Sequence, residues 1–132
     1  LGPLLFLCYI SDLPSVVDPD TQVRLFADDC LIYRTIRSLS DQLQFQEDLN
    51  KLSLWGQQWG MSFNTAKCNI LTVTSSEKSL TKMYTIEGRI LQHVELSSYL
   101  GILIHRSLGF GDHIREVAAK ANKKLGFLKR NL

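Results

Sequence analysis

The sequence predicts an α+β fold in which helices pack against a largely antiparallel sheet. Three observations lead to this prediction: a long segment with helical spacing of its apolar residues, two segments that resemble β-hairpins, and an apolar fraction large enough for a core. The expected order is helix, hairpin, helix, strand, hairpin, strand, helix. The chain has 132 residues, of which 45% are hydrophobic and 21% charged, as expected for one domain.

Composition and cysteine usage exclude several classes of protein. The longest apolar stretch, residues 4–10, is far shorter than the about 20 residues that a membrane-spanning helix requires. Cys8, Cys30 and Cys68 are odd in number, far apart and form no Cys-x-x-Cys pair, which argues against a disulfide framework and a zinc site. We therefore expect an intracellular protein of the nucleus or cytoplasm, neither secreted nor bound to a membrane.

The first predicted element is a short buried helix that begins at Gly2 and Pro3. Proline is favoured at the first helical position because an N–H group there would have no partner within the helix. An apolar run fills this segment up to Ile10, and residues 12–14 are expected to end it. Because the chain begins with Leu1 rather than methionine and ends within a helical pattern, we expect an internal segment of a longer protein.

Residues 23–34 predict a β-hairpin with Asp28 and Asp29 at its turn, since β-branched and aromatic residues flank both aspartates. A helix of about five turns follows. Ser38 and Asp41 resemble a capping box at its start, and Gly60 is a plausible end. The apolar residues at helical spacing between them are Phe45, Leu49, Leu52, Trp55 and Trp59.

The second half of the chain predicts shorter elements and a basic helix. We expect a strand over 68–74, a loop over 75–82, a hairpin over 84–91 and a strand over 99–105. After a break at 109–111, the final helix carries six Lys or Arg residues against two acidic residues, whereas the whole chain has a net charge of +2. A polyanionic partner would bind this end, although a solvated basic face has the same pattern.

The adjacent carboxylates of Asp28 and Asp29 are unusual for a tight hairpin turn. Such turns prefer Asn-Gly or Asp-Gly, whereas two aspartates place like charges side by side between apolar strands. A hard cation such as Mg²⁺, which binds carboxylate oxygens at about 2.0–2.1 Å, would remove this repulsion. From the spacing alone, an ordinary solvated acidic turn remains the alternative.

The residues around this turn resemble a known family. Phe26-Ala27-Asp28-Asp29 is similar to the aromatic-x-Asp-Asp hairpin of reverse transcriptases. Other segments resemble motifs of that family and follow in the family's order. They are residues 1–6 and 9–14 (the end of a template-side motif and its helix), 55–68 (the helix-turn-strand motif), 99–102 (the primer-grip strand) and 112–114 (the start of the next helical region). The combination is most similar to non-LTR (LINE-type, jockey-like) retrotransposon enzymes.

The resemblance implies templated nucleotide addition with two Mg²⁺ (or Mn²⁺) ions. Asp28 would be the main metal ligand and Asp29 the supporting one. A third carboxylate of the family lies upstream of the position where this sequence begins, so we expect the chain by itself not to polymerise. Lys67 stands where the family has a lysine near the incoming triphosphate, where it could screen or protonate the leaving pyrophosphate. A solvated lysine is the alternative.

The resemblance also implies residues that bind the template and primer. Gly2 and Pro3 would shape the floor under the template base, although helix initiation explains them equally well. Phe26 would pack beneath the primer terminus, and the basic final helix would contact duplex phosphates. The remaining residues implied are Tyr99, Leu100 and Gly101 at the primer grip and Lys120, Lys123 and Lys124 on the final helix.

Residues 1–105 would thus form part of a reverse-transcriptase palm, and 106–132 the start of a thumb or connection helix. The implied partners are an RNA template, a DNA primer, dNTPs and the upstream part of the same polypeptide, which would hold the fingers and the first palm strands. Two alternatives remain: a nucleic-acid-binding remnant of a retroelement without catalysis, and a structural module with an acidic turn. We expect Trp55, Trp59, Phe110 and the three cysteines to be core residues.

Overall fold

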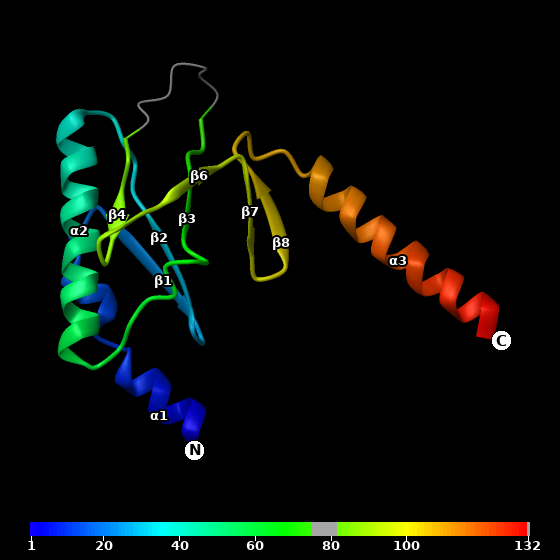
Figure 1. Ribbon diagram of the computed structural model, residues 1–132, viewed down its shortest axis with the longest axis horizontal. Coiled ribbons are helices and arrows are strands. Elements are labelled where there is room, and N and C mark those ends of the chain that lie inside the picture. The colour runs from blue at the N-terminus through cyan, green and yellow to red at the C-terminus, as the bar shows by residue number, and fades with distance from the viewer. Residues whose placement is uncertain (75–81, 132) are drawn as a thin grey trace. The chain divides into compact units, whose positions relative to one another are not determined.

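A computed structural model describes residues 1–74 and 82–131 (Figure 1). Within these residues the mixed α+β class is confirmed, since α-helices, a 3-10 helix and short strands occur together. The chain divides into two compact units, each of which is described by itself. Unit 1 comprises residues 1–68 and 82–91, and unit 2 comprises residues 69–81 and 92–132. Except for Lys82, the loop predicted at 75–82 lies outside the described residues.

The longest element of unit 1 is α2 (Leu39–Gln58), and its start is the predicted capping box. The Ser38 hydroxyl accepts a hydrogen bond from the Asp41 backbone N–H at 3.2 Å, and the Asp41 carboxylate accepts one from the Ser38 N–H at 2.9 Å. Two N–H groups that the helix leaves without partners are thereby satisfied. The helix ends at Gln58, and Gly60 follows with a φ of 67°, a conformation that glycine adopts readily.

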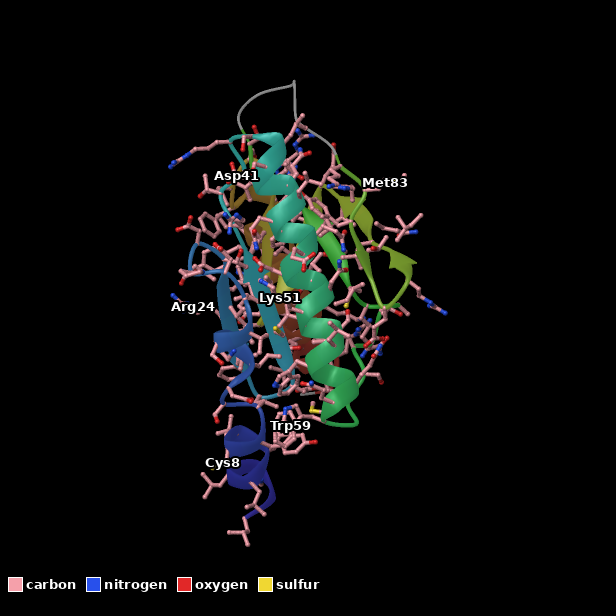
Figure 2. All side chains as sticks on the ribbon, turned by 90° about the vertical axis from the view of Figure 1, so that its left-hand side faces the viewer. Cys8, Arg24, Asp41, Lys51, Trp59 and Met83 are labelled. Carbon is pink, nitrogen blue, oxygen red and sulfur yellow. The ribbon has the colours of Figure 1, made fainter. Side chains whose placement is uncertain are left out.

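One face of α2 forms most of the core of unit 1. Leu52 is fully buried, and Phe45 contacts the ring of Tyr84 edge-on, with the ring centroids 5.1 Å apart. Both views place α2 beside the hairpin and β4 (Thr85–Ile86) (Figures 1 and 2). Burial of these apolar side chains is the main force that holds the helix in place. The buried apolar residues are Ile10, Leu13, Val23, Phe45, Leu49, Leu52, Trp55, Tyr84, Ile86 and Leu91.

Two antiparallel hairpins complete the sheets of unit 1, and both were predicted. In the first, β1 (Gln22–Phe26) pairs with β2 (Asp29–Tyr33). In the second, β4 pairs with β5 (Arg89–Ile90). The turn of the second hairpin is Glu87-Gly88, with φ values of 48° and 75°, which is the backbone that a two-residue hairpin turn requires.

Unit 2 contains two small sheets and a long helix. β3 (Asn69–Leu71) pairs in parallel with β6 (Gln92–Val94), and β7 (Leu96–Tyr99) pairs antiparallel with β8 (Ile102–His105). The helix α3 (Gly111–Asn131) begins against β8, where the Leu103 N–H donates to Nδ1 of His113 at 3.3 Å. The predicted final helix is therefore present, and β3 is shorter than the strand predicted over 68–74.

The sheet predictions need two corrections. The strands within the described residues form four separate two-stranded sheets, one of them parallel, rather than one largely antiparallel sheet. The single strand predicted over 99–105 is wrong as well, because Leu100 and Gly101 form the turn between β7 and β8. Their φ values are 48° and 80°. The apolar residues on both sides make a nearly continuous run over 99–104, so Gly101 was the one local sign of a tight turn.

The prediction of a buried first helix is also wrong. α1 (Gly2–Tyr9) contains no buried residue, and the side chains of Leu4 and Leu5 are 65% and 60% exposed. Its ring contact with α2 is between Tyr9 and Trp59, whose centroids lie 5.3 Å apart. A helix that is apolar on every side needs neighbours on every side to be buried, and one contact does not supply them.

Other residues expected in the core are exposed as well. Trp55 is buried as predicted, but Trp59 lies at the end of α2 and is 46% exposed. Phe110 precedes α3 and is 60% exposed. Cys8 is exposed on α1, while Cys30 and Cys68 are half-buried. Trp59, Cys68 and Phe110 lie just outside a helix or strand, where fewer neighbours are available to cover them.

A buried polar cluster in unit 1 was not predicted from the sequence. Asp48 lies on the apolar face of α2 with none of its side chain exposed, and the side chain of Arg34, which follows β2, is 8% exposed. Nη1 of Arg34 lies 2.7 Å from Oδ1 of Asp18 and 4.0 Å from Oδ2 of Asp48. The remaining charged groups within 4 Å of this cluster are Asp20, Asp41 and Lys51. A buried carboxylate requires such partners because its desolvation is costly.

Truncation of Leu52 tests the core of unit 1. Leu52→Ala should lower the free energy of unfolding by about 2–5 kcal/mol, because it removes a fully buried side chain and leaves a cavity. Leu54→Ala is the matched control on the same helix, since Leu54 is 59% exposed and its truncation should cost about 0.5 kcal/mol or less. Urea unfolding followed by circular dichroism measures both. Equal decreases in the free energy of unfolding would contradict the orientation of α2 in which Leu52 faces the core and Leu54 faces solvent.

The charged cluster predicts how stability depends on pH. Hydrogen bonding from Arg34 lowers the pKa of Asp18 below its usual value, and hydrogen bonds from the Arg37 N–H and the Ser38 hydroxyl lower the pKa of Asp41. A carboxyl whose pKa is lowered on folding stabilises the protein above its unfolded pKa of about 3.9 and loses that contribution as the pH falls. As the pH falls from 5 to 2, the free energy of unfolding measured with urea should therefore decrease less in Asp18→Asn than in the wild type.

The control for this measurement is Asp20→Asn, because the Asp20 side chain is 85% exposed and lies in the same loop. We expect this variant to follow the wild-type acid dependence. An Asp18→Asn variant with the same acid dependence as the wild type would contradict the assignment.

Candidate functional site

The β1–β2 hairpin presents two adjacent carboxylates at its tip. Phe26 and Asp29 are the last directly paired residues, so Ala27 and Asp28 form the two-residue turn. The structure therefore places one predicted carboxylate in the turn and the other at the first position of β2. Asp28 and Asp29 are both exposed. Paired residues of a hairpin lie on one face, so the 62%-exposed ring of Phe26 is a neighbour of Asp29.

The backbone of this turn is unusual at Ala27. Its φ is 51°, in the left-handed region that glycine, asparagine and aspartate adopt more readily than alanine. A two-residue hairpin turn requires a positive φ at its first central position, and this requirement explains the conformation. The turn thus fixes the direction in which the chain leaves Phe26 and re-enters β2 at Asp29.

The loop that carries Lys67 lies near the hairpin. A turn closes where the Lys67 N–H donates to the carbonyl of Asn64 at 2.9 Å, and the Lys67 side chain is exposed. Cys68 follows Lys67, Cys30 follows Asp29, and the two thiols interact electrostatically. Burial, with a smaller contribution from Cys68, raises the pKa of Cys30 to about 11. This interaction links the residue after Lys67 with the residue after Asp29, both within unit 1.

The described residues contain no group of three or more His, Cys, Asp or Glu side chains that could hold a metal ion. What the hairpin offers is two carboxylates on adjacent residues. Carboxylate oxygens are hard donors that suit Mg²⁺ and Mn²⁺, and two of them leave most of an octahedral coordination sphere open. The donor chemistry fits a divalent cation that takes its other ligands from elsewhere.

The other predicted site residues are spread over both units. Gly2 and Pro3 begin the exposed helix α1, and a Cβ added at Gly2 would meet nothing within 4 Å. Tyr99 ends β7, and Leu100 and Gly101 form the following turn in unit 2. Lys120, Lys123 and Lys124 are exposed on α3. The Lys67 loop and the hairpin both belong to unit 1.

The first 109 residues match the family described as reverse transcriptase (RNA-dependent DNA polymerase). The chain belongs to this family. The matched residues of the reverse transcriptase chain include the hairpin, α2, the Lys67 loop and the strands β3 to β8. The expected family is confirmed.

Curated relatives agree with this assignment. The chain is 29% identical to the RNA-directed DNA polymerase from mobile element jockey of Drosophila melanogaster and 28% identical to the jockey polymerase of Drosophila funebris, over 89% and 86% of its length. It is 28% identical over 95% of its length to the probable RNA-directed DNA polymerase from transposon X-element of Drosophila melanogaster. The chain spans 13–14% of the length of these relatives. No solved structure matches significantly.

The sequence analysis did not single out Thr21, Arg34 and Asp48, which form the buried polar cluster beside the hairpin. One signal was available, since Asp48 interrupts the apolar face of α2 between Phe45 and Leu49. A charged residue at a core position indicates a buried partner. Its partner could not be identified from spacing, because Arg34 is fourteen residues away on another element. None of the described helices is long and apolar enough to cross a membrane.

Thiol reactivity tests the environment of the hairpin. With a pKa of about 11, the Cys30 thiol should hold about one thiolate in a thousand at pH 8, so alkylation should be slow. Exposed Cys8 is the internal control and should react first with iodoacetamide. Mass spectrometry of peptides from a time course gives both rates. A Cys30 that reacts as fast as Cys8 would contradict the half-buried position of this thiol.

Proposed function

We propose that this chain is part of the RNA-directed DNA polymerase of a non-LTR retrotransposon and carries two of its catalytic carboxylates. The observation that supports this most directly is the pair Asp28 and Asp29, exposed at the tip of a hairpin within the residues that match the family. Residues 1–105 belong to the palm and 106–132 begin the thumb. The polymerase acts in the nucleus or cytoplasm on an RNA template, a DNA primer and dNTPs.

Asp28 is the main metal ligand and Asp29 the supporting one. Two divalent ions bound there would lower the pKa of the primer 3′-hydroxyl and neutralise the leaving pyrophosphate. Two adjacent carboxylates cannot by themselves hold both ions, so the remaining carboxylate comes from an upstream strand of the longer polypeptide. The 132-residue chain alone is therefore inactive in this proposal.

Lys67 has an accessory role at the triphosphate. Its loop lies near the hairpin, as the interaction between Cys30 and Cys68 indicates. An ammonium group in this place attracts the triphosphate and screens the charge that develops on the pyrophosphate. Phe26, on the same face of the hairpin as Asp29, packs against the primer terminus.

Template and primer are bound by residues of both units in this proposal. Gly2 and Pro3 lie under the template base, and Tyr99, Leu100 and Gly101 form the primer grip. Lys120, Lys123 and Lys124, exposed on α3, contact backbone phosphates without reading sequence. The upstream part of the polypeptide supplies the fingers and the first palm strands.

A substitution at the hairpin tip tests the proposal. In a longer polypeptide that carries this chain, Asp28→Asn should lower RNA-templated DNA synthesis with Mg²⁺ by about 1,000-fold or more, because it removes a ligand charge from the metal site. The assay measures dNTP incorporation on an RNA template with an annealed DNA primer. Glu47→Gln, an exposed position on α2, is the matched control and should retain activity.

Retained activity in Asp28→Asn would refute the catalytic assignment. An inactive wild-type polypeptide that binds template and primer would favour the alternative function, a nucleic-acid-binding remnant without catalysis. The exposed basic residues of α3 are the observation that favours this alternative.

A further inference from the structure

The strand residues of the hairpin that carries Asp28 and Asp29 are mostly half-buried or exposed. Of its ten strand residues, Val23 is the buried one. The others are exposed or half-buried, including both residues of the last pair at the tip. Apolar packing of Val23 and of the half-buried residues is non-directional, so it does not by itself set the angle at which a two-stranded ribbon leaves the domain.

The base of the hairpin is held by polar groups instead. Thr21 directly precedes β1 and Arg34 directly follows β2, so these two residues close the end of the ribbon opposite to the tip. Nη1 of Arg34 donates to the Thr21 hydroxyl oxygen at 3.0 Å. The Thr21 hydroxyl in turn donates to Oδ2 of Asp48, on α2, at 2.5 Å. Both strands are thus joined to the same buried carboxylate.

The rest of the cluster fixes this carboxylate and the guanidinium. Oδ1 of Asp48 accepts from the Asp18 N–H at 3.0 Å and from the Gln44 side chain at 3.2 Å. The Arg34 guanidinium is shared with Asp18 at 2.7 Å and approaches Asp41 at 3.7 Å. Asp48 therefore receives donors from the hairpin, from the loop before it and from α2, and no rotation of the hairpin leaves all of these contacts intact.

We propose that Thr21, Arg34 and Asp48, here named the hairpin clamp, are positioning residues that set the orientation of Asp28 and Asp29 relative to α2. The inference rests on the proposed function of the two aspartates. A small tilt at the base gives a larger displacement at the tip. Five strand residues span about 17 Å, so a tilt of about 5° at the base moves the tip by about 1.5 Å. Catalytic groups must be held within about 0.5 Å, and an error of about 1 Å can cost about 100-fold in rate.

A contribution to stability alone does not account for the clamp. Replacing a buried ion pair by apolar residues is often neutral or stabilising, so such a cluster is weak evidence for a stabilising role. An ionic cluster does fix the orientation of the groups that it joins, because hydrogen bonds to a fixed carboxylate are lost on small rotations. The clamp joins the two strand ends at the base, and its effect is therefore expected at the tip.

The first test uses the 132-residue chain and does not depend on catalysis. Thr21→Val removes the hydroxyl from the clamp and keeps the shape of the side chain, whereas Thr21→Ser keeps the hydroxyl. Amide hydrogen exchange of β1 and β2 should become about tenfold faster in Thr21→Val and stay near wild type in Thr21→Ser. Exchange over α2 should be unchanged in both variants.

Two outcomes of this experiment would overturn the proposal. One is unchanged exchange in the hairpin of Thr21→Val. The other is equally faster exchange in α2 and the hairpin, which would mean that the hydroxyl supports the stability of unit 1 as a whole. Circular dichroism of each variant confirms that it is folded.

The second test measures steady-state polymerisation in a longer polypeptide that carries this chain. Thr21→Val should lower kcat by about 10- to 100-fold with KM for dNTP nearly unchanged, because the clamp touches no substrate. Thr21→Ser should restore kcat. Equal kcat values for the two variants would overturn the positioning role. If Asp28→Asn retains activity while the hydrogen-exchange result holds, the proposed function fails and the clamp remains a property of the hairpin.

Discussion

The architecture of unit 1 depends on a carboxylate that has no contact with water. Asp48 lies on the face of α2 that also carries Phe45 and Leu49, and a charge in such surroundings is tolerated only when donors and a counter-ion surround it. The donors come from residues 18 and 21, and the guanidinium comes from Arg34 at the end of β2. Helix, loop and hairpin must therefore be assembled together before this group is satisfied.

The same residue type has opposite environments at the two ends of the hairpin. At the base, Asp48 is buried and saturated by protein donors. At the tip, Asp28 and Asp29 are exposed, and their oxygens are available to an external cation. Five residues of strand separate a carboxylate that organises the fold from carboxylates that are available for chemistry. A buried carboxylate at the base and exposed carboxylates at the tip thus occur on the same ribbon and its support.

Local sequence signals predicted the elements that are determined locally. The capping box of Ser38 and Asp41, the acidic hairpin tip and the hairpin predicted over 84–91 depend on residues close together in the chain. The membership of the reverse transcriptase family was likewise accessible, since it rests on the order of short motifs. The roles of the individual site residues remain proposals.

Two features were not predicted correctly because they depend on contacts between residues far apart in the chain. Whether α1 is buried depends on neighbours that its own apolar pattern cannot supply, and the pairing of Arg34 with Asp48 joins residues on different elements. The Leu100-Gly101 turn was missed for a different reason, because the continuous apolar residues around it are typical of one buried strand. One glycine was the only local sign that the chain reverses there.

The left-handed backbone conformation of Ala27 limits the conformations that the hairpin turn can adopt. Alanine tolerates this backbone at a cost of about 1–2 kcal/mol, whereas glycine would adopt it without strain. Glycine would also give the turn access to many more backbone conformations, both folded and unfolded. Compared with glycine, alanine at position 27 therefore lowers the stability of the turn and narrows the range of backbone conformations open to it. The positive φ of Ala27 therefore restricts the backbone at the point where the chain turns toward Asp28 and Asp29.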